Sequence, residues 1–190
     1  GFGEVYQAAM ESAGGVRTNV AVKVLHHGLD PRSQAVQRLR DEGRLLGILN
    51  HPSILRVTDL VLLDGRIALV TEYVEGADLD YCIKADDCIG PRALVEVCGR
   101  VADALHAAYH TESPDGGKLA LIHRDIKPSN IRLGRHGDVK VLDFGIAKAA
   151  GIKREAKTQA KAIIGSYLYM APERFDEDQA SLKSDVYALG

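Results

Sequence analysis

One stretch in the second half of the chain, residues 121–145, constrains the fold more than any other. It reads LIHRDIKPSNIRLGRHGDVKVLDFG, with apolar runs at Ile131–Gly134 and Val139–Leu142 separated by the polar turn RHGD. Such runs predict a tight antiparallel β-hairpin. Asn130 precedes the first run by as much as Asp143 follows the second, so antiparallel pairing predicts that their side chains meet at the open end. An amide oxygen beside a carboxylate suits Mg²⁺, which takes its other ligands from water and phosphate.

The loop in front of this hairpin adds charged side chains to the same place. Asp125 and Lys127 precede Asn130 on one short segment. We therefore expect an acid and a lysine beside the metal pair. Such a constellation indicates phosphate chemistry.

These residues resemble the catalytic loop and metal-binding segment of the eukaryotic-type (Hanks-type) protein kinases. The family pattern H-R-D-x-K-x-x-N, followed by D-F-G, is met from His123 to Gly145. Other segments are similar to bacterial serine/threonine kinases of that family, in the expected order: GFGEVY, HPSIL, YMAPE and SDVYALG. The resemblance covers essentially the whole chain. It implies an α+β, bilobal, protein-kinase-like fold, with a small antiparallel β lobe and one helix in residues 1–75 and a mostly helical large lobe in residues 76–190.

Apolar periodicity predicts further elements. Ile54–Leu63 and Arg66–Val74 are typical of two strands joined by the turn Asp64–Gly65. Ala77–Ala85 and Arg92–His110 are typical of helices. The second of these helices has one apolar face, made of Leu94, Val97, Val101, Leu105 and Ala108.

Two charged residues of the first lobe stand in apolar surroundings. Val20–Leu25 is typical of a strand buried on both faces, yet it contains Lys23, and a buried lysine needs an anion. Glu42 lies on the apolar stripe of a helix predicted from Asp30–Pro31 to about Leu49, where an unpaired acid is too costly. The resemblance implies that Lys23 holds the nucleotide phosphates and pairs with Glu42. The alternative is that both residues lie on the surface.

The resemblance also implies a nucleotide site. Gly3 matches the last glycine of a phosphate-binding loop, and Val5 matches the valine that covers the base. Thr71–Gly76 is similar to the hinge where adenine binds, with the backbone of Glu72 and Val74 as partners. The implied nucleotide contacts are Gly3, Val5, Ala21, Lys23, Glu72, Val74, Arg132 and Asp143. Arg132 departs from the family pattern, which has an apolar side chain under the adenine, so we expect its stem and guanidinium plane to stack on the ring.

The catalytic roles follow from the same resemblance. Asp125 would orient the attacking hydroxyl, and Lys127 would neutralise the transferred phosphoryl group. Asn130 and Asp143 would hold Mg²⁺, with Mn²⁺ as an alternative metal. Lys127 in this loop is the serine/threonine form of the pattern. His123 is expected to pack rather than catalyse, in a stack with Leu46, Val57, Phe144 and Asp185.

The segment from Asp143 to Glu173 resembles the activation segment. Its middle, Lys153–Ala162, is charged and lacks apolar periodicity, which predicts a loop that orders only when pinned. We hypothesise that phosphate on Thr158 pairs with Arg124 or nearby lysines and orders the segment. Unchanged autophosphorylation in a Thr158→Ala variant would contradict this, and the alternative is an ordinary loop threonine. Ser166 is instead expected to contact the catalytic aspartate.

Composition restricts the partners. A formal net charge of −2 gives no electrostatic reason to expect nucleic acid or an anionic membrane surface. No apolar run approaches the ~18 residues of a membrane span. The three cysteines lack C-x-x-C spacing, as expected for free thiols in a reducing, cytoplasmic setting. An anchor outside this segment and the oligomeric state are left open.

The function implied is an ATP-dependent protein serine/threonine kinase acting on Ser and Thr hydroxyls of protein substrates. The alternatives are a pseudokinase that acts as a scaffold or binding module, and a small-molecule kinase of related fold. The family pattern also implies a kinase segment truncated at both ends. We therefore expect these 190 residues alone to be marginally stable and poorly active.

Overall fold

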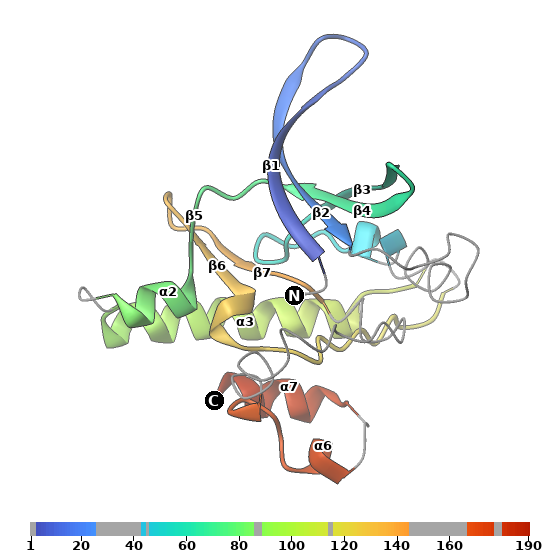
Figure 1. The fold of residues 1–190 in the computed structure, drawn as a ribbon. Coiled ribbons are helices and arrows are strands. Elements are labelled where there is room, and N and C mark those ends of the chain that lie inside the picture. The colour runs from blue at the N-terminus through green and yellow to red at the C-terminus, as the bar shows by residue number, and fades with distance from the viewer. Residues whose placement is uncertain are drawn as a thin grey trace. The chain divides into compact units, whose positions relative to one another are not determined.

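The structure is a computed structural model (Figure 1) that describes residues 3–25, 43–44, 46–85, 89–113, 116–144, 167–176 and 180–190. The described residues divide into two compact units. The first unit contains the residues up to Ile48 together with Arg56–Tyr73. The second unit contains Leu49–Leu55 and the described residues from Val74 onward.

The first unit is built on a four-stranded antiparallel sheet with the strand order β1-β2-β4-β3. The strands are β1 (Gly3–Glu11), β2 (Arg17–Leu25), β3 (Val57–Leu63) and β4 (Arg66–Glu72). The predicted Asp64–Gly65 turn is confirmed, with φ of 49° and 75° at these two residues. Two successive positive φ angles match the twist of a tight hairpin, and Asp-Gly tolerates them better than most pairs.

The core of this sheet lies on one face. It consists of Val20, Val22, Val24, Ala68 and Val70. Ala21 and Lys23 alternate with these valines and are only partly buried. The prediction that this strand is buried on both faces is therefore wrong: β2 alternates like a strand of a one-sided antiparallel sheet. Lys23 stands on the less covered face.

The helix predicted to end near Leu49 is described only in part. Residues 43–44 and 46–48 are helical, and Leu46 and Leu49 are buried. The last described helical residue is Ile48, which agrees with the predicted end. The predicted start of this helix lies outside the described residues.

The second unit combines a small sheet with helices (Figure 1). The sheet has the order β5-β6-β7, formed by β5 (Gly76–Asp78), β6 (Ile131–Gly134) and β7 (Val139–Val141). The helices are α2 (Leu79–Lys84), α3 (Pro91–His110), α6 (Glu173–Asp176), α7 (Leu182–Leu189) and a short 3₁₀ helix, Pro128–Asn130. The predicted 131–142 hairpin is confirmed as β6–β7.

Helix α3 packs against β7 and α7. Its buried residues are Val97, Val101, Ala104, Leu105 and Ala108, so the predicted apolar face is confirmed apart from Leu94, which is half-buried. Proline at the first helical position begins the helix, where its missing N–H costs nothing. Among the described residues, no helix combines the length and apolar character that a membrane span would need.

The predicted helix from Ala77 begins two residues late. Gly76–Asp78 form strand β5 on β6, and α2 starts at Leu79. The close pairing depends on glycine, because a Cβ at Gly76 would collide with the carbonyl group of Leu133. Pairing with a strand more than fifty residues away along the chain overrides the local helical pattern.

Candidate active site

The loop that precedes β6 joins three of the predicted site residues. Lys127 Nζ donates to Asp125 Oδ2 over 2.9 Å. Asn130 Nδ2 donates to the backbone oxygen of Asp125 over 2.7 Å and to its Oδ2 over 3.2 Å. The 3₁₀ helix brings Asn130 back toward Asp125, with Asn130 N–H bound to the Lys127 carbonyl. An acid, a cation and an amide thus form one cluster on a short segment.

The side-chain amide of Asn130 has a defined orientation. Its Nδ2 end is committed to Asp125, so Oδ1 is the atom that could serve as a metal ligand. Across the hairpin, Leu142 N–H donates to the Asn130 carbonyl over 2.8 Å, and Ile131 pairs with Val141. Asn130 therefore lies opposite Leu142, one residue short of the predicted alignment with Asp143. Asp143 itself has φ of 52°, so its backbone turns away from the strand direction.

These two residues supply a suitable donor set for a small hard cation. The set contains only two protein ligands, an amide oxygen and a carboxylate, and both are oxygen donors, as Mg²⁺ prefers. Within the described ranges, no group of three or more His, Cys, Asp and Glu residues is suited to a metal. A Mg²⁺ ion held by two protein groups takes its remaining ligands from water and phosphate.

His123 is fully buried and has both ring nitrogens engaged. Nε2 lies 2.7 Å from the Leu142 carbonyl, and Nδ1 lies 3.2 Å from the N–H of Asp125. A carbonyl only accepts and an N–H only donates, so the ring is neutral with its proton on Nε2. Burial lowers the pKa of His123, which favours the same neutral form. The ring packs on Phe144 with centroids 4.7 Å apart, so the predicted contact between His123 and Phe144 is confirmed.

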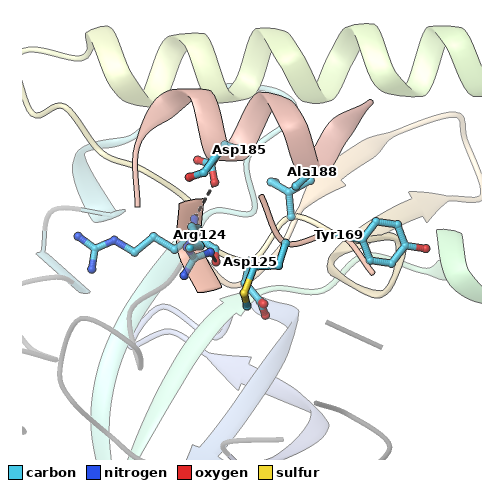
Figure 2. Close-up of a pocket in the computed structure, with 9 residues that line it drawn as sticks. Arg124, Asp125, Tyr169, Asp185 and Ala188 are labelled. Carbon is cyan, nitrogen blue, oxygen red and sulfur yellow. Dashed lines mark hydrogen bonds between the residues drawn. The ribbon is translucent and has the colours of Figure 1, made fainter. Parts of the chain in front are cut away.

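Asp185, at the start of α7, binds the backbone just before the cluster. Its carboxylate accepts from His123 N–H over 2.7 Å. It also accepts from Arg124 N–H over 2.9 Å (Figure 2). Burial raises the pKa of Asp185, while the two N–H groups and the charge of Arg174 oppose that rise. Arg174 Nη1 donates to the Arg124 carbonyl over 2.7 Å. Arg124, with φ of 70°, is thus held on both sides of its backbone.

A small pocket is lined by residues of this backbone and of helix α7. Asp125, Tyr169, Asp185 and Ala188 are among the side chains that line it (Figure 2). Figure 2 also shows the Arg124 side chain extending away from that of Asp125. The pocket has a volume of about 10 Å³, close to that of one water position, so it is too small for a substrate.

Arg132 lies on β6 with its guanidinium bound by two oxygens of the same unit. Nη1 donates to Asp78 Oδ1 over 2.9 Å, and Nε donates to the Val74 carbonyl over 3.2 Å. Both partners lie on the segment that includes β5. The predicted stacking on a nucleotide base stays a prediction, but the guanidinium already has a fixed position.

Comparison with known proteins identifies the family. A model of the protein kinase domain matches residues 1–190. The chain belongs to the protein kinase family. The α+β fold expected from the sequence is thereby confirmed, and the β sheet of the first unit and the helices of the second agree with it.

Several bacterial kinases are similar to this kinase chain over most of its length. The chain is 34% identical to the tyrosine-protein kinase MasK of Myxococcus xanthus over its whole length, which is 30% of that protein. It is 35% identical to the serine/threonine-protein kinase PknH of Mycobacterium tuberculosis, again over the whole chain and 28% of that protein. The serine/threonine-protein kinase PrkC of Bacillus subtilis is 33% identical over 90% of the chain and 25% of its own length. The chain thus spans less than a third of each of these relatives.

The remaining predicted site residues lie on other segments of the chain. Lys23 is on β2, paired with Val5 of β1, and Ala21 is paired with Thr71 of β4. A Cβ at Gly3 would collide with the Val24 carbonyl, so a glycine is required there. Glu72 ends β4, and Val74 is the first residue of the second unit after Tyr73. Glu42, Gly145, Thr158 and Ser166 lie outside the described residues.

Three residues of the candidate site were not predicted in the roles that the structure gives them. Asp185 was expected only in a packing stack, yet it binds two backbone N–H groups. Arg174 and Asp78 were not singled out. Asp185 carries the strongest sequence signal, because an acid among the apolar residues of a helix must find donors when it is buried. Nothing local to Arg174 or Asp78 distinguishes them from surface charges.

Proposed function

We propose that this chain acts as the catalytic domain of an ATP-dependent protein serine/threonine kinase, which transfers the γ-phosphoryl group to Ser and Thr hydroxyls of protein substrates. The observation that supports this best is the cluster of Asp125, Lys127 and Asn130 at the open end of a hairpin that leads to Asp143. In this proposal residues 1–75 belong to the N-terminal lobe and residues 76–190 to the C-terminal lobe.

The catalytic loop has the groups that phosphoryl transfer needs. Asp125 would accept or orient the proton of the attacking hydroxyl, and Lys127, 2.9 Å from its carboxylate, would neutralise the transferred group. The two side chains are only 13% and 14% exposed, so their charges are screened less than surface charges. Asn130 Oδ1 and Asp143 would hold Mg²⁺ or Mn²⁺, which would neutralise phosphate charge when bound.

The proposed nucleotide contacts are those that the family pattern implies. Lys23 would bind phosphate oxygens and pair with Glu42, as the family pattern implies. The backbone of Glu72 and Val74 would bind the base. The remaining proposed contacts are Gly3, Val5, Ala21, Arg132 and Asp143.

Serine/threonine specificity rests on Lys127 and on the relatives. Lys127 two residues after the catalytic aspartate is the serine/threonine form of the pattern. PknH and PrkC are named serine/threonine kinases, whereas MasK is named a tyrosine kinase. The acceptor therefore has to be measured directly.

The test uses the complete protein that contains this chain. It is incubated with labelled ATP, Mg²⁺ and three peptides that differ only in a Ser, Thr or Tyr acceptor. We expect label on the Ser and Thr peptides, and a loss of about 10²–10⁴ in kcat for Asp125→Asn, as is typical for removal of a positioned acid or base. Label on the Tyr peptide alone would refute the specificity. No transfer by the wild type would refute the activity and favour a binding module.

A further inference from the structure

Arg132 fastens the segment from Val74 to Asp78 to strand β6. Its Nε binds the Val74 carbonyl and its Nη1 binds Asp78, so one planar side chain bridges residues at the two ends of this segment. Arg132 and Asp78 are directly opposite in the β5–β6 pairing. The fork of the guanidinium suits two acceptors at once, which a lysine could not reproduce.

The hydrogen bond between Arg132 and Val74 lies at the proposed binding site of the nucleotide base. At Val74 the chain re-enters the second unit from Tyr73 of the first unit. Glu72 and Val74 are the proposed backbone contacts to the nucleotide base. The hydrogen bond from Arg132 holds the Val74 carbonyl in place. This carbonyl belongs to the same residue as the Val74 N–H, so the bond also restricts the backbone next to that N–H. A base that binds this backbone then meets groups that are already in position.

A second arginine on the same hairpin makes a different contact. Arg135 Nη1 donates to Glu75 Oε1 over 2.7 Å, and Arg135 N–H donates to the Glu75 carbonyl over 2.9 Å. Its side chain and that of Glu75 are 60% and 63% exposed, against 27% and 41% for Arg132 and Asp78. The Arg135 ion pair is therefore more strongly screened by solvent. It offers a matched control on the same two segments.

We propose that Arg132 is a positioning residue for nucleotide binding, which presets the Val74–Asp78 segment through its contacts with the Val74 carbonyl and Asp78. This inference rests on the proposed ATP-dependent activity. Arg132 acts in the free protein, before the nucleotide arrives, so its removal adds an ordering cost to binding. The chemical step depends on the separate cluster around Asp125. The loss therefore appears in the affinity for ATP.

The test compares Arg132→Met with Arg135→Met in the complete protein. Methionine keeps an unbranched apolar stem and removes both hydrogen bonds. We expect Arg132→Met to raise the KM for ATP and the Kd of Mg²⁺-ATP about tenfold, slightly less than the loss of one full hydrogen bond to a charged group would cause. The kcat should change by less than about twofold. Arg135→Met is expected to leave KM, Kd and kcat within about twofold.

The outcomes separate the two proposals. An unchanged Kd and KM in Arg132→Met, an equal rise in Arg135→Met, or a loss confined to kcat would each overturn the positioning role. If Arg132→Met does not fold, Asp78→Asn replaces it, and it should raise the Kd in the same direction by a smaller factor; no change in the Kd would overturn the proposal. Absence of phosphoryl transfer in the wild type would refute the proposed activity alone, because calorimetry of Mg²⁺-ATP still tests Arg132.

Discussion

The buried carboxylate of Asp185 allows a quantitative prediction about the catalytic loop. Asp185 is 2% exposed and accepts the N–H groups of His123 and Arg124 over 2.7 and 2.9 Å. In Asp185→Asn, one carboxylate oxygen becomes an NH₂ group that faces an N–H donor. One backbone hydrogen bond is lost, and a buried donor is left unsatisfied. Hydrogen bonds to charged groups contribute about 1.5–3 kcal/mol, and an unsatisfied buried group costs about 1–3 kcal/mol.

Removal of the charge partly offsets this loss. Burial raises the pKa of Asp185, which means that the charged form is desolvated at a cost, and the neutral amide avoids that cost. We therefore expect a net local destabilisation of about 2–3 kcal/mol. Since about 1.4 kcal/mol is a factor of ten, amide hydrogen exchange at residues 123 and 124 should become roughly 30- to 160-fold faster.

Hydrogen exchange followed by mass spectrometry on the complete protein measures this directly. Peptides that cover residues 121–126 report on the two N–H groups. Asp80→Asn serves as the control, because Asp80 makes only a partly exposed ion pair with Lys84, worth about 0.3–0.5 kcal/mol for a pair of this spacing. Unchanged exchange at residues 121–126 in Asp185→Asn would show that Asp185 does not hold the loop, and the reasoning would fail.

Two further predictions concern stability. Gly76→Ala is expected to destabilise the protein by about 1–3 kcal/mol, as overpacking does, because its Cβ would collide with the Leu133 carbonyl. Gly99→Ala, with open space at the Cβ position in helix α3, should stabilise the protein by about 0.5–1 kcal/mol. The midpoints of denaturant unfolding should therefore fall for Gly76→Ala and rise for Gly99→Ala, and shifts in the same direction would contradict the packing argument. Lowering the pH from about 7.5 to 5.5 should cost stability through His123, because burial places its folded pKa below the unfolded value of about 6.5, so the unfolded chain binds the proton first. The raised pKa of Asp185 has the opposite effect on stability as the pH falls. We therefore compare the pH dependence of thermal unfolding in the wild type with that in His123→Gln. Equal pH dependence in the two proteins would contradict the role of His123.

The sequence predicts those parts of the fold that local patterns determine. The Asp64–Gly65 turn follows from the tolerance of these residues for positive φ, and the buried face of α3 follows from helical spacing. The contact between Asp125 and Asn130 is predictable because the two residues lie close together along the chain. In each case the residues that decide the structure lie within a few positions of one another.

Parts of the structure that depend on distant partners were not predictable in this way. Strand β5 forms because Gly76 lets the chain approach β6, which overrides the helical pattern that begins at Ala77. Lys23 was expected on a strand buried on both faces, but how much of each face is covered depends on the elements that pack there. The bond from Arg132 to Val74 joins residues 58 positions apart, and that from Asp185 to His123 joins residues 62 apart. No local spacing rule connects such pairs.

The backbone of residues 123–125 shows how an irregular loop can hold a catalytic carboxylate in place. Three successive N–H groups have side-chain acceptors: those of His123 and Arg124 bind Asp185, and that of Asp125 binds the ring of His123. Two successive N–H groups that point at one carboxylate form an anion-binding concavity, and a left-handed residue is typical of such a turn. The φ of 70° at Arg124 is therefore a requirement of this contact, and its cost of order 1–3 kcal/mol is offset by hydrogen bonds to a charged acceptor. The position of Asp125 is thus set by α7 and a buried imidazole, which explains why it needs neither a strand nor a helix of its own.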